Sequence, residues 1–266
     1  MAKVVLITGA SSGIGKVTAE YLLQKGYKVY GTSRNPKPAR FNFPIIQLDV
    51  TEISSIENAI QYLLKKEGKI DVLVNNAGIG ITGPIEETPS EEIRKAFETN
   101  FFGAIEVMKS VIPPMRKQNS GLIINITSIA GYTGLPFRGI YSACKSALEI
   151  VTESIRMEVK EFGIKVTNIA PGDIATNIVE GRYHTPIFND SPYKEVYQRN
   201  LDLMNSHVSE GTDPIEMAIA IEKVIGKSDP RIHYKFGNFM QKFSIVLKRI
   251  LPDRVYEKLI MNYYKM

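Results

Sequence analysis

Cysteine is almost missing from this chain of 266 residues, which contains only Cys144. A single cysteine excludes a disulfide framework, and the three histidines belong to no Cys/His cluster with the spacing of a zinc site. No stretch approaches the roughly 18 uncharged apolar residues that a membrane-spanning helix needs. We therefore expect neither disulfides nor a metal, and we expect the reducing cytoplasm as the location.

We expect no cleavable signal, because Met1-Ala2-Lys3 runs directly into the apolar Val4–Ile7. Apolar residues make up 44% of the chain and charged residues 23%, which is ordinary for one large soluble domain. The charge is unevenly spread, since residues 231–266 hold eight lysines and arginines and two acids, a net +6. The preceding residues net −1, so the basic character belongs to the tail, where no nucleic-acid motif accompanies it.

Apolar, β-branched runs alternate with segments of helical period along most of the chain. We expect strands at 4–7, 28–31, 44–48, 72–74, 122–126, 166–169 and 232–236. We expect helices near 14–25, 53–67, 90–117, 140–162 and 214–225. This alternation predicts an α/β fold, a Rossmann-like doubly wound parallel sheet of about seven strands in a three-layer αβα arrangement.

We expect a single domain over residues 1–236, followed by a basic amphipathic helical tail over 237–266 that is not an independent domain. The tail has helical patterns at 239–250 and 253–264, with apolar stripes on one side and lysines and arginines on the others. Two interpretations stay open. The tail either packs on the body with a solvated basic face, or forms an interfacial helix pair that touches acidic lipid or a partner.

A glycine-rich turn follows the first expected strand, where Thr8 to Gly15 read Thr-Gly-Ala-Ser-Ser-Gly-Ile-Gly. Glycines let the backbone approach a pyrophosphate that rests on amide groups at a helix N-terminus. The second strand ends in Gly31-Thr32-Ser33-Arg34-Asn35, with one arginine and no acid. An acid there would bind the ribose 2′-hydroxyl of NAD, whereas an arginine suits a 2′-phosphate. We therefore expect NADP(H) in preference to NAD(H).

Tyr141 and Lys145 stand four residues apart, and Ser128 lies thirteen residues before the tyrosine. Residues at this spacing share one face of a helix, so an ammonium can sit beside a phenol. A free tyrosine titrates near pH 10 and is a poor acid at neutral pH, but a neighbouring cation favours the phenolate. The pattern therefore predicts a tyrosine that acts as a general acid or base.

With these motifs in order, residues 3–180 resemble the short-chain dehydrogenase/reductase family. Asn75–Gly78 match the Asn-Asn-Ala-Gly that steadies the central sheet, and Asp49 matches the position that contacts the adenine. The resemblance implies a catalytic tetrad of Asn100, Ser128, Tyr141 and Lys145. It also implies cofactor contacts at Gly9, Ser11, Ser12, Gly13, Ile14, Gly15, Ser33, Arg34, Asp49, Val50, Asn76, Ala77, Gly78, Tyr141, Lys145, Pro171, Gly172, Ile174 and Thr176.

The resemblance also assigns roles within the tetrad. Tyr141 would exchange a proton with the substrate oxygen, and Ser128 would hold that oxygen. Lys145 would support the phenol and bind the nicotinamide ribose, while Asn100 would hold a water that links Lys145 to solvent. The nicotinamide would carry the hydride chemistry.

The segment after Gly172 commonly forms a lid in this family, here about 173–211. The side chains expected to line it are apolar: Ile174, Ile178, Val179, Tyr183, Ile187 and Phe188, with Leu135 and Phe137 from the loop before Tyr141. This composition favours a hydrophobic secondary alcohol or ketone, and the length and basic tail look similar to members acting on steroids, retinoids or other lipids.

Two other functions stay open: a 3-oxoacyl-carrier-protein reductase and a non-catalytic NADP(H)-binding sensor. Family members are often oligomers through the helices near 97–117 and 140–162, so we expect a homodimer or homotetramer. Peripheral contact with a membrane is the other expectation for the tail.

Overall fold

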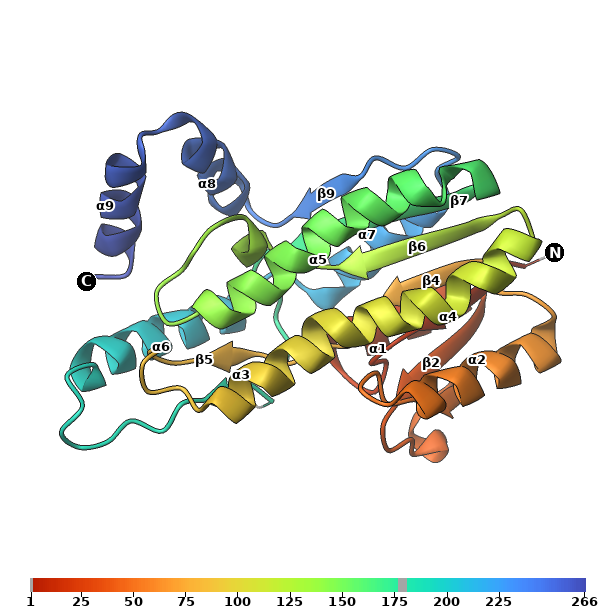
Figure 1. Cartoon of the computed structure of the whole chain (residues 1–266), viewed down its shortest axis with the longest axis horizontal. Coiled ribbons are helices and arrows are strands. Elements are labelled where there is room, and N and C mark those ends of the chain that lie inside the picture. The colour runs from red at the N-terminus through yellow and green to blue at the C-terminus, as the bar shows by residue number, and fades with distance from the viewer. Residues whose placement is uncertain (1, 177–180) are drawn as a thin grey trace.

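The computed structural model describes residues 2–176 and 181–266, which form a parallel sheet covered by helices on both faces (Figure 1). The strand order is β3-β2-β1-β4-β6-β7-β9, as expected for a doubly wound sheet of seven strands. The strands are β1 (Val4–Ile7), β2 (Lys28–Ser33), β3 (Ile45–Gln47), β4 (Val72–Asn75), β6 (Gly121–Ile126), β7 (Ile164–Pro171) and β9 (His233–Phe236). The predicted fold class is confirmed.

Alternating side chains of the strands supply a core to each face of the sheet. In β1, Val4 and Leu6 pack toward α2 (Ile53–Glu67), α4 (Gly103–Lys117) and α5 (Gly139–Glu158). Val5 and Ile7 pack on the opposite face, which α1 (Gly13–Gln24) and α7 (Pro214–Ile225) cover. All four side chains are buried, as parallel strands with two covered faces require.

The predicted helix over 90–117 is divided in two. α3 (Ser90–Phe97) passes through a π-helical turn, Glu98–Phe102, before the chain continues as α4. The turn contains Asn100, which is buried, and its wider backbone changes the direction in which that side chain points. Helical periodicity alone does not reveal such a turn.

A row of polar side chains crosses the sheet just before the carboxyl ends of its strands. Asn75, Asn125, Asn168 and His233 occupy matching positions on β4, β6, β7 and β9. The Asn75 amide donates to Asn125 Oδ1 at 3.0 Å. Because these polar groups are buried or partly buried, each needs a hydrogen-bond partner, and α5 supplies several of these partners.

Two residues of α5 complete this polar row. Thr152 Oγ1 accepts from Asn125 Nδ2 at 2.9 Å. The buried Glu149 carboxylate accepts from Asn168 Nδ2 at 2.7 Å and lies 2.9 Å from His233 Nδ1. A hydrogen bond of this kind contributes about 1 kcal/mol, and an unsatisfied buried partner costs about 1–3 kcal/mol. The row therefore fixes one register of α5 over the sheet.

The described part of the segment 173–211, for which the sequence predicted no regular structure, contains two elements. β8 (Tyr183–His184) pairs in parallel with the short β5 (Ile81–Thr82), and α6 (Lys194–Ser209) follows. One stripe of α6 is buried, formed by Tyr197, Asn200, Met204 and Val208. Asn200 stands where an apolar residue would complete the helical pattern, which explains why α6 was not predicted.

The tail forms α8 (Phe239–Ile250) and α9 (Asp253–Tyr263), which stand together at one end of the molecule (Figure 1). Its inner side packs on the body, where Ile245 joins a small apolar cluster with Ile129 and Ala170. Gln241 Nε2 donates to Asp173 Oδ2 at 2.7 Å, beside the cavity described below. Packing on the body, one of the two interpretations of the tail, is therefore observed for this side.

Candidate active site

A cavity of about 470 Å³ lies at the carboxyl ends of β1, β2, β4, β6 and β7. The chain brings all four members of the predicted tetrad, Asn100, Ser128, Tyr141 and Lys145, to its wall. The predicted cofactor residues also line it, except Gly15: Gly9, Ser11, Ser12, Gly13, Ile14, Ser33, Arg34, Asp49, Val50, Asn76, Ala77, Gly78, Pro171, Gly172, Ile174 and Thr176.

Gly15 does not line the cavity but packs closely behind the turn, and its predicted contact with the cofactor stays a prediction. A Cβ atom there would lie 2.4 Å from Asn76 Nδ2 and 2.5 Å from Gly9 O. Gly9 itself has φ +67, a conformation that side chains other than glycine's rarely adopt. The turn thus needs glycine at one position for its conformation and at another for space.

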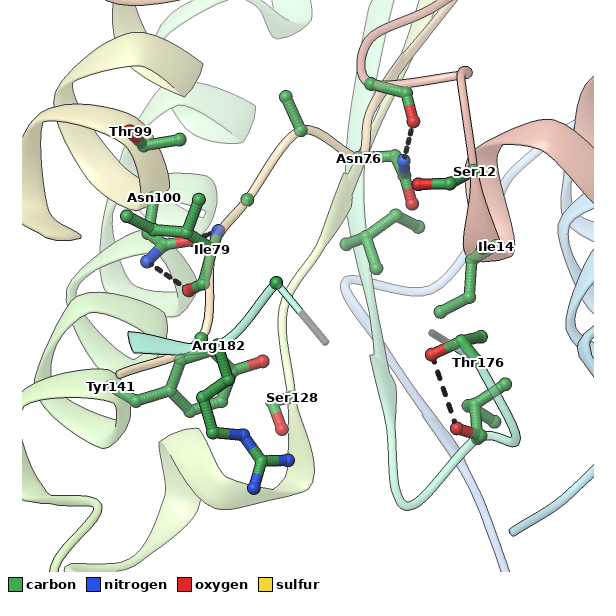
Figure 2. Close-up of a pocket in the computed structure, with 18 of the residues that line it drawn as sticks. Ser12, Ile14, Asn76, Ile79, Thr99, Asn100, Ser128, Tyr141, Thr176 and Arg182 are labelled. Carbon is green, nitrogen blue, oxygen red and sulfur yellow. Dashed lines mark hydrogen bonds between the residues drawn. The ribbon is translucent and has the colours of Figure 1, made fainter. Parts of the chain in front are cut away.

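Asn76, at the end of β4, holds the glycine-rich turn in place. Its Nδ2 donates to Thr8 O at 3.0 Å and to Gly9 O at 3.1 Å, one of which is drawn in Figure 2. The backbone amides of Asn76 and Ala77 in turn donate to Thr8 Oγ1. These hydrogen bonds join the carboxyl ends of the neighbouring strands β1 and β4.

The start of α1 suits a phosphate group. Ser12 is its N-cap in extended conformation and makes no side-chain capping bond, and the first turn contains no acid. The first amide groups of a helix have no partner within the helix and carry partial positive charge. Arg34, exposed at the end of β2, lines the same cavity. The donors of this part therefore fit the phosphate groups of a dinucleotide.

Tyr141 and Lys145 lie on adjacent turns of α5 and face the cavity. Lys145 is buried, and its Nζ donates to Ile126 O at 3.0 Å and lies 5.9 Å from the centroid of the Tyr141 ring. Ser128 caps the short helix after β6, where its Oγ accepts from Ala130 N at 3.2 Å. Figure 2 shows the Tyr141 hydroxyl and Ser128 at the same side of the cavity.

Asn100 reaches the site from the π-helical turn. Its Oδ1 accepts from Ile79 N at 3.0 Å and its Nδ2 donates to Ile79 O at 2.9 Å, as Figure 2 shows. A Cβ atom at Gly78 would lie 2.7 Å from Asn100 Oδ1 and 3.5 Å from Lys145 Nζ. Gly78 thus lies between the two side chains, and its missing side chain leaves room there for small polar groups.

The lid differs from its expected apolar lining. Among the described residues of that set, only Ile174 lines the cavity. Phe137 instead packs edge-on against Tyr197, and Phe188 is 67% exposed. Tyr183, Ile187 and Leu135 also lie outside the cavity wall, while Ile178 and Val179 fall outside the described residues.

Residues from distant segments take the place of that expected lining. Arg138, Arg182, Met204 and Val208 line the end of the cavity near Tyr141. Sequence reasoning named none of them, although Arg138 lies one helical turn before Tyr141. Cys144, next to Lys145, is buried, and burial raises the pKa of its thiol to about 11, which disfavours the reactive thiolate at neutral pH.

Glu149 and His233 were also missed as residues that support the site. The Glu149 carboxylate accepts from Thr127 Oγ1, next to Ser128, and from the Tyr132 hydroxyl at 2.7 Å. It thereby ties the loop after β6, which contains Ser128, to α5. The sequence signal was the spacing, since Glu149 continues the Tyr141–Lys145 stripe by another four residues.

Within the part of the chain that the structure describes, no helix is both long and apolar enough to cross a bilayer. The same residues contain no group of three or more His, Cys, Asp or Glu side chains that could hold a metal ion.

Known proteins are similar to this chain in sequence. A 3-ketodihydrosphingosine reductase from Bacteroides thetaiotaomicron is 37% identical over 263 residues and covers 98% of each chain. An NADPH-dependent 3-dehydrocapnine reductase from Ornithobacterium rhinotracheale is 29% identical, over 96% of this chain and 94% of its own.

Solved structures of other proteins have a similar fold. A short-chain dehydrogenase from Streptomyces avermitilis superimposes with a TM-score of 0.82 at 30% identity, over 100% of this chain and 96% of its own. ElxO with NADP bound has a TM-score of 0.73 at 31% identity, over 89% of this chain and 97% of its own. The family model of the short chain dehydrogenases matches residues 3–186. The chain therefore belongs to the short-chain dehydrogenase/reductase family, the oxidoreductases that act on CH–OH groups through a nicotinamide cofactor.

Proposed function

We propose that this protein is an NADPH-dependent reductase that converts the ketone of a long-chain lipid-like substrate to a secondary alcohol. The observation that most supports this proposal is that Tyr141, Ser128 and Lys145 line the same cavity as the glycine-rich turn and Arg34. The names of the two relatives, both reductases of 3-keto compounds, support reduction as the direction and a lipid ketone as the substrate.

In this proposal each residue has one task. Ser128 Oγ donates a hydrogen bond to the carbonyl oxygen, and Tyr141 delivers a proton to it as negative charge develops there. Lys145, held by Ile126 O, keeps a positive charge beside the phenol. Bound NADPH would supply the hydride. Asn100 would hold a water near Gly78 through which Lys145 exchanges protons with solvent.

The cofactor preference rests on Arg34. Its exposed side chain stands at the end of β2, and the following Asn35 lines the cavity as well. No acid occupies the end of this strand, so the 2′-hydroxyl of NAD would lack its usual carboxylate partner. A guanidinium instead forms charge-assisted hydrogen bonds with a 2′-phosphate.

The outer side of the tail supports a peripheral membrane contact. Phe239, Phe243, Val246 and Ile250 form one exposed stripe of α8, although its opposite side packs on the body. The tail from residue 239 onward contains six lysines and arginines and two acids. An apolar stripe flanked by basic side chains fits the surface of an anionic bilayer, which would also deliver a lipid substrate.

Exposed apolar side chains on the α4–α5 face support the homo-oligomer that the family resemblance implies. Phe102, Ile150 and Met157 are 47%, 64% and 71% exposed. The molar mass in solution would test this, since a 29.8 kDa monomer would contradict it.

Loss of the phenol hydroxyl should abolish turnover. In Tyr141→Phe we expect kcat for ketone reduction to fall by about 10²–10⁴-fold, the usual contribution of a general acid, with nearly unchanged NADPH binding. NADPH absorbance with a panel of 3-keto lipids, steroids, retinoids and acyl thioesters measures it. Tyr193→Phe, which removes a phenol hydroxyl bonded to Glu86 outside the cavity, is the control and should keep full activity.

Retained kcat in Tyr141→Phe would refute the mechanism. Activity with acyl-carrier thioesters but not free ketones would indicate the carrier-protein reductase, and binding of NADPH without its oxidation would indicate the sensor.

Reversal of the charge at Arg34 should reverse the cofactor preference. We expect Arg34→Asp to lower kcat/KM for NADPH by about 10–100-fold, because hydrogen bonds to charged groups contribute about 1.5–3 kcal/mol. The kcat/KM for NADH should rise. Arg40→Asp, the same substitution at another exposed arginine, should leave the ratio of kcat/KM for NADPH to that for NADH unchanged. A ratio that barely moves in Arg34→Asp would rule out the assignment.

The tail should bind anionic vesicles through its exposed stripe. We expect the intact protein to sediment with phosphatidylserine-containing vesicles, less so at high salt, and the double variant Phe239→Glu/Ile250→Glu to stay in the supernatant. Ile53→Glu, at an exposed isoleucine on α2, should sediment like the wild type. If the wild type itself stays in the supernatant, the membrane contact is wrong.

A further inference from the structure

Two guanidinium groups face the reacting end of the cavity, and the proton transfer described above uses neither. Arg138 and Arg182 both line the cavity wall with Tyr141, and both are half-buried. They come from segments far apart in the sequence, one at the start of α5 and one before β8. Two cations in one partly desolvated place repel each other unless an anion joins them.

The fold holds Arg138 firmly beside the catalytic tyrosine. It is the N-cap of α5, and its Cζ lies 6.0 Å from the centroid of the Tyr141 ring. The carbonyl oxygen of the preceding Phe137 accepts hydrogen bonds from Gly83 N and Thr82 Oγ1, both at 2.9 Å. Arg138 therefore extends from a backbone that is fixed to the β5 segment.

Arg182 reaches the same place from the lid. The next residue, Tyr183, donates to Gly80 O at 2.9 Å in the β5–β8 pair. The stem of Arg182 lies over Gly80, where an added Cβ atom would be 2.9 Å from its Cγ. In Figure 2 the stem of Arg182 passes the Tyr141 ring, and its guanidinium lies on the side of Ser128; Arg182 lines the cavity.

Neither arginine has a carboxylate partner among the described residues. No ion pair within 4.0 Å involves either of them there. Arg182 Nη1 donates to Asn205 Oδ1 at a long 3.4 Å, and Arg138 donates a hydrogen bond to the Tyr264 hydroxyl. Asp173, the acid that lines this end of the cavity, accepts from Gln241. Burial and then the charge of Arg138 lower the pKa of Arg182, while the charge of Asp173 acts in the opposite direction.

Apolar side chains complete this end of the cavity. Met204 and Val208, from the buried stripe of α6, line the wall with Ile81 of β5. A ligand that fits here would thus have an oxyanion for the guanidinium groups and an apolar part for the α6 side.

We propose that Arg138 and Arg182 form an anion-binding subsite for an acidic head group of the substrate, so that the natural substrate is an anionic long-chain ketone. This inference rests on the proposed function and narrows its substrate class. Planar guanidinium groups pair with the oxygens of a carboxylate, sulfonate or phosphate. Binding the anion beside Tyr141 would also place the nearby carbonyl group at the hydroxyl of that tyrosine.

The test compares ketones of equal chain length that differ only in the head group. Long-chain 3-ketones with a sulfonate, a phosphate, a carboxylate or an uncharged hydroxyl at C1 are assayed by NADPH oxidation. We expect kcat/KM for the preferred anionic ketone to exceed that for the uncharged one by about tenfold or more, since a charged hydrogen bond is worth that much. The ranking of the three anions identifies the head group.

Removal of either guanidinium should erase most of this preference. We expect Arg182→Gln and Arg138→Gln to lower kcat/KM for the anionic ketone at least tenfold more than for the uncharged one, mainly through KM. Arg182→Lys should retain part of the preference. Arg199→Gln, at an exposed arginine of α6, should retain all of it. Binding of decyl sulfonate, compared with decanol, to the NADP⁺ complex gives a readout that needs no turnover.

Equal kcat/KM for charged and uncharged ketones would overturn the subsite and leave the reductase standing. An equal loss on both ketones in Arg182→Gln would do the same, because it would assign the arginine to packing. If no ketone is reduced, the proposed function fails. In that case, sulfonate binding that Arg182→Gln does not weaken would remove the anion site as well.

Discussion

Buried polar groups that cross the sheet hold α5 in one register, and the arrangement of the site depends on them. Tyr141, Lys145, Glu149 and Thr152 form one stripe of α5 at helical spacing. Glu149 and Thr152 accept hydrogen bonds from asparagine side chains of the strands, whereas Tyr141 and Lys145 face the cavity. A shift of α5 by one residue would turn the stripe by about 100° and break both sets at once. The positions that hold the helix on the sheet and the positions that face the cavity therefore lie on a single helix face.

The carboxyl ends of the parallel strands provide the other half of the site. Matching register across β4, β6 and β7 brings Asn76, Ser128 and Pro171 to one edge. Positive charge gathers at this edge, where Lys145, Arg138 and Arg182 surround the phenol, while the buried Glu149 lies behind it. Charge that develops on a substrate oxygen would thus meet cations and donors already in position.

The sequence was most informative where one local pattern decides the structure. β-Branched runs predicted the seven strands of the sheet, because a parallel sheet with two covered faces leaves few alternative arrangements. The position of the turn from Thr8 to Gly15 directly after the first strand also predicted that it lies at the cavity. The predicted tetrad also meets in one cavity. Its members lie on adjacent elements whose order the family resemblance already implied.

Prediction was poorest where distant segments meet or where a polar residue interrupts a pattern. Asn200 interrupts the buried stripe of α6, and the π-helical turn at Asn100 leaves no mark in the periodicity. Five of the apolar residues expected to line the lid lie outside the cavity wall, and Arg182, next to the β5–β8 pair, lines it instead. Such long-range pairing cannot be read from the composition of the lid.

The most direct measurement follows a labelled hydride. The protein is supplied with a long-chain 3-ketone and NADPH that carries deuterium on the transferred position of its nicotinamide, and the product is analysed by mass spectrometry. The account predicts an alcohol with one deuterium on the former carbonyl carbon, formed at the rate at which NADPH is consumed. An alcohol without the label, or NADPH that binds and is never consumed by any ketone, would contradict it.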